Sequence, residues 1–320
     1  MRKTALITGI AGQDGKYLCK YLKALNYSIY GIDTCSYSNS ELKEYGITQV
    51  HQVDISRNLP VGDIISDLKP DEIYNLAAAH RTEHQDKKLS ASSMVNINAI
   101  SVVNMLRVCA QKVPNVKFFQ AGSSEMFGNS FDHDGMQRVD TPMNPVTSYG
   151  KAKQKAHEAV IEYRKNYGLF ACNGILYNHE SPYRHERFVT TKVVKTAVKI
   201  KKGLEGRLEL GDLSAGRDWG HAKDYVRAMH LILAHRQPSD WIIATGQTST
   251  IREVCEYVFG KLNLDYRDYV EEKQKLTRDE YLKIPCGDPG RTKDVLKWEM
   301  DYNLHSTLDE MLDYWNKRIG

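Results

Sequence analysis

The feature that most constrains the fold is a glycine-rich turn near the start of the chain. A short apolar run, Thr4–Thr8, leads directly into Gly9, Gly12 and Gly15, and an amphipathic helical pattern follows. Glycine lets backbone amides approach a pyrophosphate closely, and the next helix presents unpaired N–H groups and its positive dipole end to that anion. Strand, glycine turn and helix in this order predict a dinucleotide site. A glycine-rich turn without a ligand is the alternative.

The first half of the chain alternates between strand and helix patterns. The runs expected to be strands are Thr4–Thr8, Ser28–Asp33, Gln49–Val53, Glu72–Ala77 and Lys117–Ala121. Segments with apolar residues at i, i+3 and i+4 lie between most of them. Repeated β-α units predict an α/β fold with a doubly wound, parallel Rossmann sheet, whose ligands bind at the carboxyl ends of the strands.

After Leu176 this alternation weakens and helical patterns dominate. The sequence therefore predicts a second, smaller and mostly helical domain that holds the substrate. The expected boundaries are 1–176 for the NAD-binding Rossmann domain, with 213–245 returning to it, and 177–212 with 246–320 for the substrate domain.

The composition is that of an ordinary soluble globular protein. The 320 residues are 41% hydrophobic and carry a net charge of only +4, which argues against a nucleic-acid surface. No signal peptide is apparent, and no run approaches the roughly 18 apolar residues of a membrane span, so we expect a cytoplasmic protein. The six cysteines form no CxxC pair and the histidines match no ligand spacing, so neither disulfides nor a metal site is expected.

Asp33 points to the identity of the coenzyme. It closes the second expected strand, where a carboxylate can accept hydrogen bonds from the adenosine ribose and would repel a 2′-phosphate. No arginine lies between Arg2 and Arg57 to neutralise such a phosphate, so we expect NAD rather than NADP. The alternative is that Asp33 only caps a loop. Asp54 and Ile55, after the third strand, are candidates for contacting the adenine.

Two further pairs carry acid–base chemistry. Tyr149 and Lys153 form YxxxK in a helical pattern, so both lie on one face, and a nearby ammonium lowers the tyrosine pKa from about 10 toward that of a general base. Ser123 and Glu125 follow the fifth strand and would point to the same side of an extended chain. The alternatives are an exposed helix face for the first pair and a helix cap for the second.

Several motifs together resemble one enzyme family. NGILYNHESP (173–182) and RDWGHAKDYV (217–226), with GIAGQDG, SSEMFG, SYGKAK and IIATG, resemble the GDP-mannose 4,6-dehydratases, which are extended short-chain dehydrogenase/reductases acting on nucleotide sugars. The similarity runs from Lys3 to about Glu253. The first two motifs are specific to that family, whereas the glycine turn and YxxxK occur throughout the superfamily.

The resemblance implies roles for individual residues. The catalytic residues are Ser123, at the place of a threonine, Glu125 as acid/base, Tyr149 and Lys153. The coenzyme-binding residues, from motif and resemblance together, are Gly9, Gly12, Gln13, Asp14, Gly15, Asp33, Asp54, Ile55, Leu76, Ala77, Ala79, Tyr149, Lys153, His179 and Arg184. The substrate-binding residues are Ser123, Asn178, Val189, Lys192, Arg217 and Arg278, and Arg217 and Arg278 suit the diphosphate.

The chain also departs from the family pattern. Asp33-Thr34-Cys35 replaces the basic residues that hold an NADP phosphate, Ala79-His80-Arg81-Thr82 replaces a sugar-pocket segment, and Tyr183 and Tyr281 replace an arginine and a glutamate. A GDP-mannose-like substrate is expected, with a GDP-heptose as alternative. A C4 oxidase or epimerase is a competing hypothesis, and so is a catalytically silent NAD-binding regulator. We expect a homodimer formed through the Tyr149 helix and the 99–109 helix, with a tetramer as the alternative.

Overall fold

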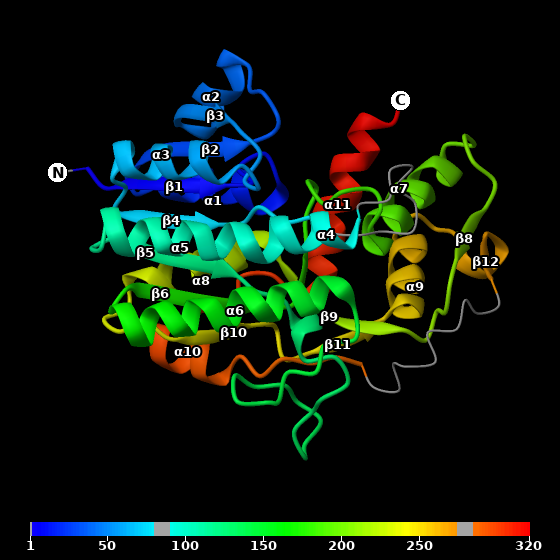
Figure 1. Cartoon of the computed structure of the whole chain (residues 1–320). Coiled ribbons are helices and arrows are strands. Elements are labelled where there is room, and N and C mark those ends of the chain that lie inside the picture. Colours follow the sequence, from blue (N-terminus) through cyan, green and yellow to red (C-terminus); the bar gives the residue numbers. More distant parts are fainter. Residues whose placement is uncertain (1, 80–89, 274–283) are drawn as a thin grey trace.

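The computed structural model describes residues 2–79, 90–273 and 284–320. Its centre is a seven-stranded sheet with the order β10-β6-β5-β4-β1-β2-β3, in which every neighbouring pair is parallel (Figure 1). These strands are β1 (Thr4–Thr8), β2 (Ser28–Asp33), β3 (Ile47–Gln52), β4 (Glu72–Asn75), β5 (Lys117–Ala121), β6 (Phe170–Leu176) and β10 (Asp240–Ile243). The predicted doubly wound Rossmann sheet is confirmed.

Helices cover both faces of this sheet. One layer contains α3 (Asn58–Leu68), α5 (Ser101–Lys112) and α6 (Ser148–Tyr167), and the other contains α1 (Gln13–Ala24), α8 (Ala222–Ala234) and α10 (Gly290–Leu296). Alternate strand residues supply the two cores: Leu6 and Phe118 pack beneath the first layer, Ile7 and Phe119 beneath the second. This alternation follows from the two-residue period of a strand. A short helix, α2 (Asn39–Tyr45), connects β2 to β3.

One helical run is long and apolar enough to cross a membrane by length and composition. It is Ser92–Lys112, in which α4 (Ala91–Val95) continues through a π-helical turn, Asn96–Ile100, into α5. In the structure α5 packs against α3 and α6 over the sheet. Its apolar residues, including Val102 and Leu106, are part of the core between these helices and the sheet.

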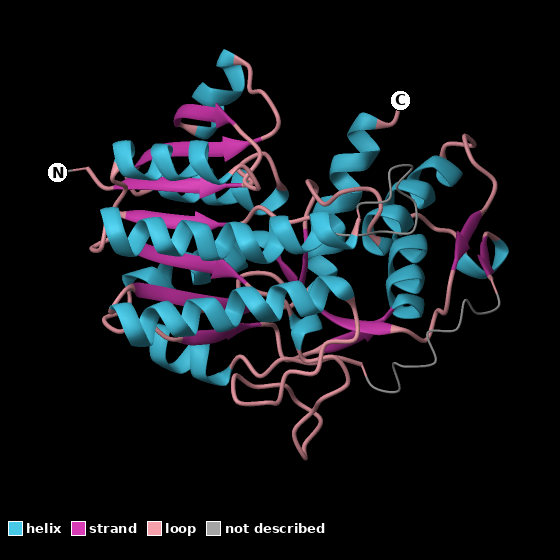
Figure 2. Cartoon of the chain, in the orientation of Figure 1, coloured by secondary structure: helices cyan, strands magenta, loops and turns pink. Residues whose placement is uncertain are grey.

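A second group of elements lies beyond the carboxyl edge of the sheet (Figure 2). It contains a sheet of β7 (Asn178–Glu180), β9 (Gly216–His221) and β11 (Thr248–Thr250), and a pair formed by β8 (Leu208–Leu210) and β12 (Val270–Glu272). Its helices are α7 (Val189–Lys201), α9 (Ile251–Lys261) and α11 (Leu304–Arg318), and 3-10 turns lie at Ser124–Met126 and Tyr266–Asp268. α7, α9 and α11 share a third core.

This division differs in two places from the boundaries expected from the sequence. Within 213–245, α8 and β10 return to the large sheet, but β9 pairs with β7 and β11. Within 246–320, α10 packs against β10 and α8. Local periodicity specifies a strand or a helix but not the sheet that it joins, so these placements depend on tertiary packing.

Candidate functional site

A cleft of about 440 Å³ opens at the carboxyl edge of the sheet. It lies where the order of the strands reverses beside β1, which is where parallel α/β sheets bind their ligands. The side chains and backbone that line it come from the glycine turn, the ends of β4, β5 and β6, the first turns of α6, and the segment after β7. The cleft therefore joins five segments that are separated in the sequence.

The glycine turn forms one wall of this cleft. Gly9 has φ +68°, and a Cβ there would lie 2.8 Å from the Cα of Ala77. Gly12 is the N-cap of α1 and no side chain caps this helix, so its first N–H groups are left for a ligand. An uncapped helix end behind a turn without side chains fits the pyrophosphate of a nicotinamide dinucleotide.

Gly9→Ala tests how strongly this wall is constrained. Positive φ and contact with the Ala77 backbone should together cost about 2–4 kcal/mol of unfolding free energy. Gly203→Ala is the matched control, because Gly203 has φ +71° with nothing within 4 Å of an added Cβ. We expect it to lose only about 1 kcal/mol in urea unfolding. Equal losses of unfolding free energy in the two variants would show that the close approach of Gly9 to Ala77 adds nothing to the cost of the substitution.

Asp33 ties the glycine turn to the end of β2. Its two carboxylate oxygens accept the backbone N–H of Ala11 at 2.9 Å and of Cys35 at 3.1 Å. The loop-capping role considered from the sequence is therefore present, and each oxygen keeps a second lone pair for a ribose hydroxyl. Asp54 accepts the N–H of Ser56 at 2.8 Å, and Ile55 is buried.

A buried ion pair joins the start of α1 to β7. Nε2 of His179 lies 3.0 and 2.9 Å from the two carboxylate oxygens of Asp14, while the amide of Gln13 donates to the carbonyl of His179 at 3.0 Å. Burial raises the pKa of Asp14, but the charge and hydrogen bond of His179 outweigh it and hold this pKa below its usual range. Asp14 thus positions His179 at the cleft, a role that the sequence pattern did not reveal.

Tyr149 and Lys153 lie in the first turns of α6 and both line the cleft. Nζ of Lys153 is 5.7 Å from the centroid of the Tyr149 ring and donates to the carbonyl of Ala121 at 2.8 Å. Helix α6 can approach the turn after β5 because Gly150 has no side chain: a Cβ there would lie 2.6 Å from the carbonyl oxygen of Glu125. The i, i+4 spacing predicts that Tyr149 and Lys153 lie on one face of the helix. The contact at Gly150 determines how close that face lies to the turn after β5.

The charges around Tyr149 differ from the simple expectation. Burial, followed by the charge of Glu125, raises the pKa of the Tyr149 phenol above its usual value, so the lowering expected from the sequence is wrong; Arg184, a hydrogen bond with Ser123 and Arg187 offset only part of this rise. Burial also lowers the pKa of Lys153 to about 8. Lysine is therefore not the dominant influence on the phenol; the two arginines contribute as well.

Ser123 and Glu125 both line the cleft, but not as part of an extended strand. Ser123 caps the 3-10 turn Ser124–Met126, and its hydroxyl accepts the N–H of Glu125 at 3.2 Å. The extended arrangement expected from the sequence is wrong, because a 3-10 turn begins at Ser124, and the helix cap given as the alternative is confirmed. The hydroxyl of Thr147, which the sequence analysis missed, donates to the carboxylate of Glu125 at 2.8 Å and also caps α6.

Some of the other residues expected to bind the coenzyme line the cleft, and others do not. Leu76 lines the cleft, as do Gln13, His179 and Arg184. Ala77 supports Gly9 from behind, and Ala79 is buried with its N–H donating to Asn98 at 3.1 Å. His80, Arg81 and Thr82, together with Arg278 and Tyr281, lie outside the described residues.

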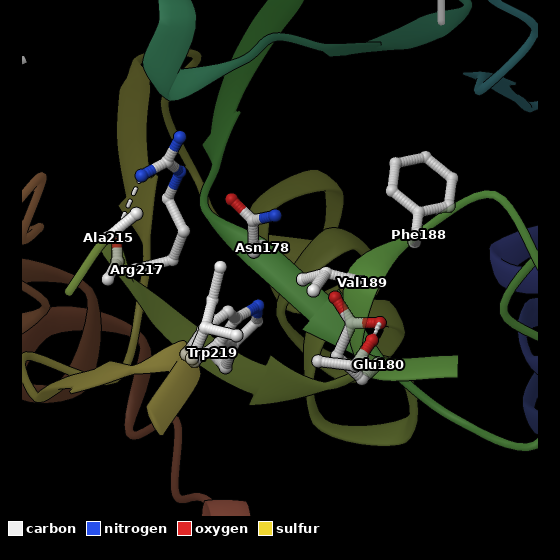
Figure 3. Close-up of a pocket in the computed structure, with 10 residues that line it drawn as sticks. Asn178, Glu180, Phe188, Val189, Ala215, Arg217 and Trp219 are labelled. Carbon is white, nitrogen blue, oxygen red and sulfur yellow. Dashed lines mark hydrogen bonds between the residues drawn. The ribbon is translucent and has the colours of Figure 1, made fainter. Parts of the chain in front are cut away.

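A second hollow of about 170 Å³ adjoins the cleft (Figure 3). Asn178 lines both hollows, while Val189 and Arg217 line only the smaller one. Its wall also contains apolar groups, including Trp219, and the polar side chains of Glu180 and Thr190. Lys192, which was expected here, instead donates from Nζ to the carbonyl of Glu209 at 2.7 Å.

Comparison with known proteins identifies the family. The model of the GDP-mannose 4,6-dehydratase family matches residues 6–311. The chain belongs to this family. A relative, GDP-mannose 4,6 dehydratase 2 of Arabidopsis thaliana, is 38% identical over 98% of this chain and 86% of its own length. The resemblance inferred from the motifs is confirmed, and with it the reaction class, the NAD(P)-dependent 4,6-dehydration of a nucleotide sugar.

Solved structures show the same fold in this chain and in more distant members of the superfamily. The dTDP-glucose 4,6-dehydratase of Bacillus anthracis, in complex with NAD, is 22% identical and superposes with a TM-score of 0.83 over 98% of this chain and 97% of its own. RMD of Pseudomonas aeruginosa, complexed with NADPH, is 19% identical with a TM-score of 0.82 over 99% and 100%. Both coenzyme types thus occur on this fold.

Proposed function

We propose that this chain converts a GDP-linked, mannose-like sugar to its 4-keto-6-deoxy form with NAD that is recycled within each turnover. The observation that carries this proposal is that Tyr149 and Glu125, from separate segments, line one cleft together with the glycine turn. Oxidation alone needs only the tyrosine and its lysine. A carboxylate beside them is what an elimination requires.

The first half of the reaction makes a ketone. A nicotinamide coenzyme, when bound at the glycine turn, would supply the hydride chemistry: removal of a hydride from C4 of the hexose and its return to C6. As the hydride leaves, Tyr149 takes the proton of the C4 hydroxyl. Ser123, which hydrogen-bonds Tyr149, is placed to hold the same oxygen. The charges of Lys153, Arg184 and Arg187 favour the phenolate that this step needs.

The second half removes water. The C4 ketone acidifies the C5 hydrogen, which Glu125 abstracts; the same carboxyl then delivers that proton to the C6 hydroxyl, which departs as water. The resulting enone receives the hydride at C6 and a proton at C5. The proton that Tyr149 gained from the C4 hydroxyl balances the one returned to C5, so the net change is the loss of one water. Thr147 orients Glu125 by its 2.8 Å hydrogen bond.

The choice of NAD over NADP rests on Asp33, which ends β2 and accepts the N–H of Ala11 in the glycine turn. In Asp33→Asn, losing the charged acceptor should weaken NAD binding and relieve the repulsion of a 2′-phosphate. We expect the ratio of NAD to NADP affinities to fall by about 10- to 100-fold, measured by coenzyme titration. A wild-type chain that prefers NADP, or an unchanged ratio in the variant, would contradict the assignment.

The proposed assembly is a cytoplasmic homodimer that pairs through α5 and α6. Exposed apolar side chains here include Ile100, in the turn before α5, at 46% and Val103 at 38%, which a second copy of these helices would cover. All six cysteines are free thiols, as a reducing compartment requires. Light scattering distinguishes the dimer from a tetramer and a monomer.

Product analysis tests the reaction. Purified protein is incubated with GDP-mannose, a GDP-heptose, UDP-glucose and dTDP-glucose, and the products are weighed. We expect a GDP-sugar to lose one water without net reduction of added NAD. An unchanged mass would indicate an epimerase, and loss of two hydrogens an oxidase. A GDP-heptose preferred over GDP-mannose would keep the mechanism and change the sugar.

A further inference from the structure

The two hollows meet at Phe188 and Asn178, which line both of them. A nucleotide sugar with its hexose at Tyr149 and its nucleoside in the smaller hollow has to carry its diphosphate past this junction. The charged groups around Phe188 therefore lie where they can contact the diphosphate.

Two guanidinium groups lie against Phe188. Cζ of Arg184 is 3.5 Å from the ring centroid, and Cζ of Arg187 is 5.1 Å from it. Arg184 has a carboxylate partner, since its Nε lies 3.1 Å from Oε2 of the buried Glu180. That same oxygen accepts the hydroxyl of Thr190 at 2.6 Å. The charge of Arg184 is thus compensated within the protein.

Arg187 is different. It is half-buried and lines the cleft, and no ion pair to it occurs within 2–79, 90–273 and 284–320; the enclosed Nε atoms of both arginines make no hydrogen bond within these residues. Burial, followed by repulsion from Arg184, lowers its pKa. Holding an uncompensated guanidinium there is costly. A cost of this kind is offset when an anionic ligand arrives.

We propose that Arg187 binds the diphosphate of the nucleotide sugar where it passes Phe188, as a substrate-binding residue additional to Asn178, Val189 and Arg217. The inference rests on the proposed function. Phosphate oxygens fit the donor fork of a guanidinium, and the diphosphate is the charged part of this substrate. The pyrophosphate of the coenzyme belongs instead to the glycine turn and the start of α1.

The local structure holds Arg187 in place. The N–H of Arg187 donates to Nδ1 of His185 at 3.2 Å, and the N–H of Phe188 donates to the carbonyl of His185 at 3.0 Å. Helix α7 begins directly afterwards at Val189 with no side-chain cap, so its positive end lies beside the junction. Arg187 and the helix end therefore favour the same anion.

The test separates the phosphates from the rest of the ligand. Binding of GDP and guanosine, UDP and uridine, dTDP and thymidine, and NAD is measured by calorimetry for the wild type, Arg187→Gln and Arg187→Lys. Whichever diphosphate binds the wild type should bind R187Q about 10- to 100-fold more weakly, with its nucleoside and NAD unchanged and part of the loss restored in R187K. Arg236→Gln, an exposed arginine before β10, is the control and should change nothing.

Three results would overturn the inference: unchanged diphosphate affinity in R187Q, equal loss for diphosphate and nucleoside, or loss of NAD affinity instead. Circular dichroism of each variant shows whether folding is preserved, and R187K keeps the test open if R187Q does not fold. Because these are binding measurements, their outcome is separate from product formation. The wild type could bind a diphosphate through Arg187 and still fail to release water from its sugar, which would refute only the proposed function.

Discussion

Tyr149→Phe is expected to lower kcat by about 10²- to 10⁴-fold, the usual contribution of a positioned general base. The phenol takes the C4 hydroxyl proton, and phenylalanine keeps the ring but removes the group that accepts it. Coenzyme affinity should stay within about threefold of the wild type, because the glycine turn and Lys153 are untouched. Steady-state kinetics of product formation and a coenzyme titration measure the two quantities.

Tyr167→Phe is the matched control for this change. Tyr167 ends the same helix and is 61% exposed, away from the cleft. It should keep full activity. If Y149F also kept activity, the phenol would have no part in proton transfer and the assignment of the cleft would be wrong.

The variant Glu125→Gln should abolish the 4-keto-6-deoxy product, with a loss of at least about 10²-fold, while C4 oxidation continues. Without a carboxylate the C5 proton is not removed, so reduced coenzyme should accumulate on the protein, visible as near-ultraviolet absorbance. Glu125 raises the pKa of Tyr149, so removing its charge should lower that pKa. The rising alkaline limb of the oxidation rate should therefore move to lower pH in E125Q.

Glu158→Gln, an exposed carboxylate on the same helix as Tyr149, serves as the control and should behave as the wild type. Undiminished product from E125Q would remove Glu125 from the mechanism. Loss of product with no reduced coenzyme would place Glu125 in the oxidation step instead.

Much of the fold and part of the site follow from the sequence because their signals are local. The glycine turn between β1 and α1 and the i, i+4 spacing of Tyr149 and Lys153 each depend on a few consecutive residues. The parallel sheet follows from repetition of such units.

The remainder depends on contacts between distant segments. Thr147 reaches Glu125 only because α6 packs closely against the turn after β5. Asp14 meets His179 across 165 residues of chain. Arg187 could not be recognised from the sequence for the same reason. Its basic neighbours are visible there, but its burial beside Phe188 without an ion pair within the described residues depends on how the chain folds.

Internal transfer of one hydride is the central claim, and isotopic labelling tests it most directly. GDP-mannose carrying deuterium at C4 is converted by the wild-type protein, and the product is examined by nuclear magnetic resonance and mass spectrometry. Because the phenol, the carboxyl group and the coenzyme are expected to serve one hexose ring, the deuterium should be found at C6 of the 4-keto-6-deoxy product. A product that still carries deuterium at C4 would contain no C4 ketone and would contradict internal hydride transfer. Deuterium found on coenzyme released from the protein would contradict it as well.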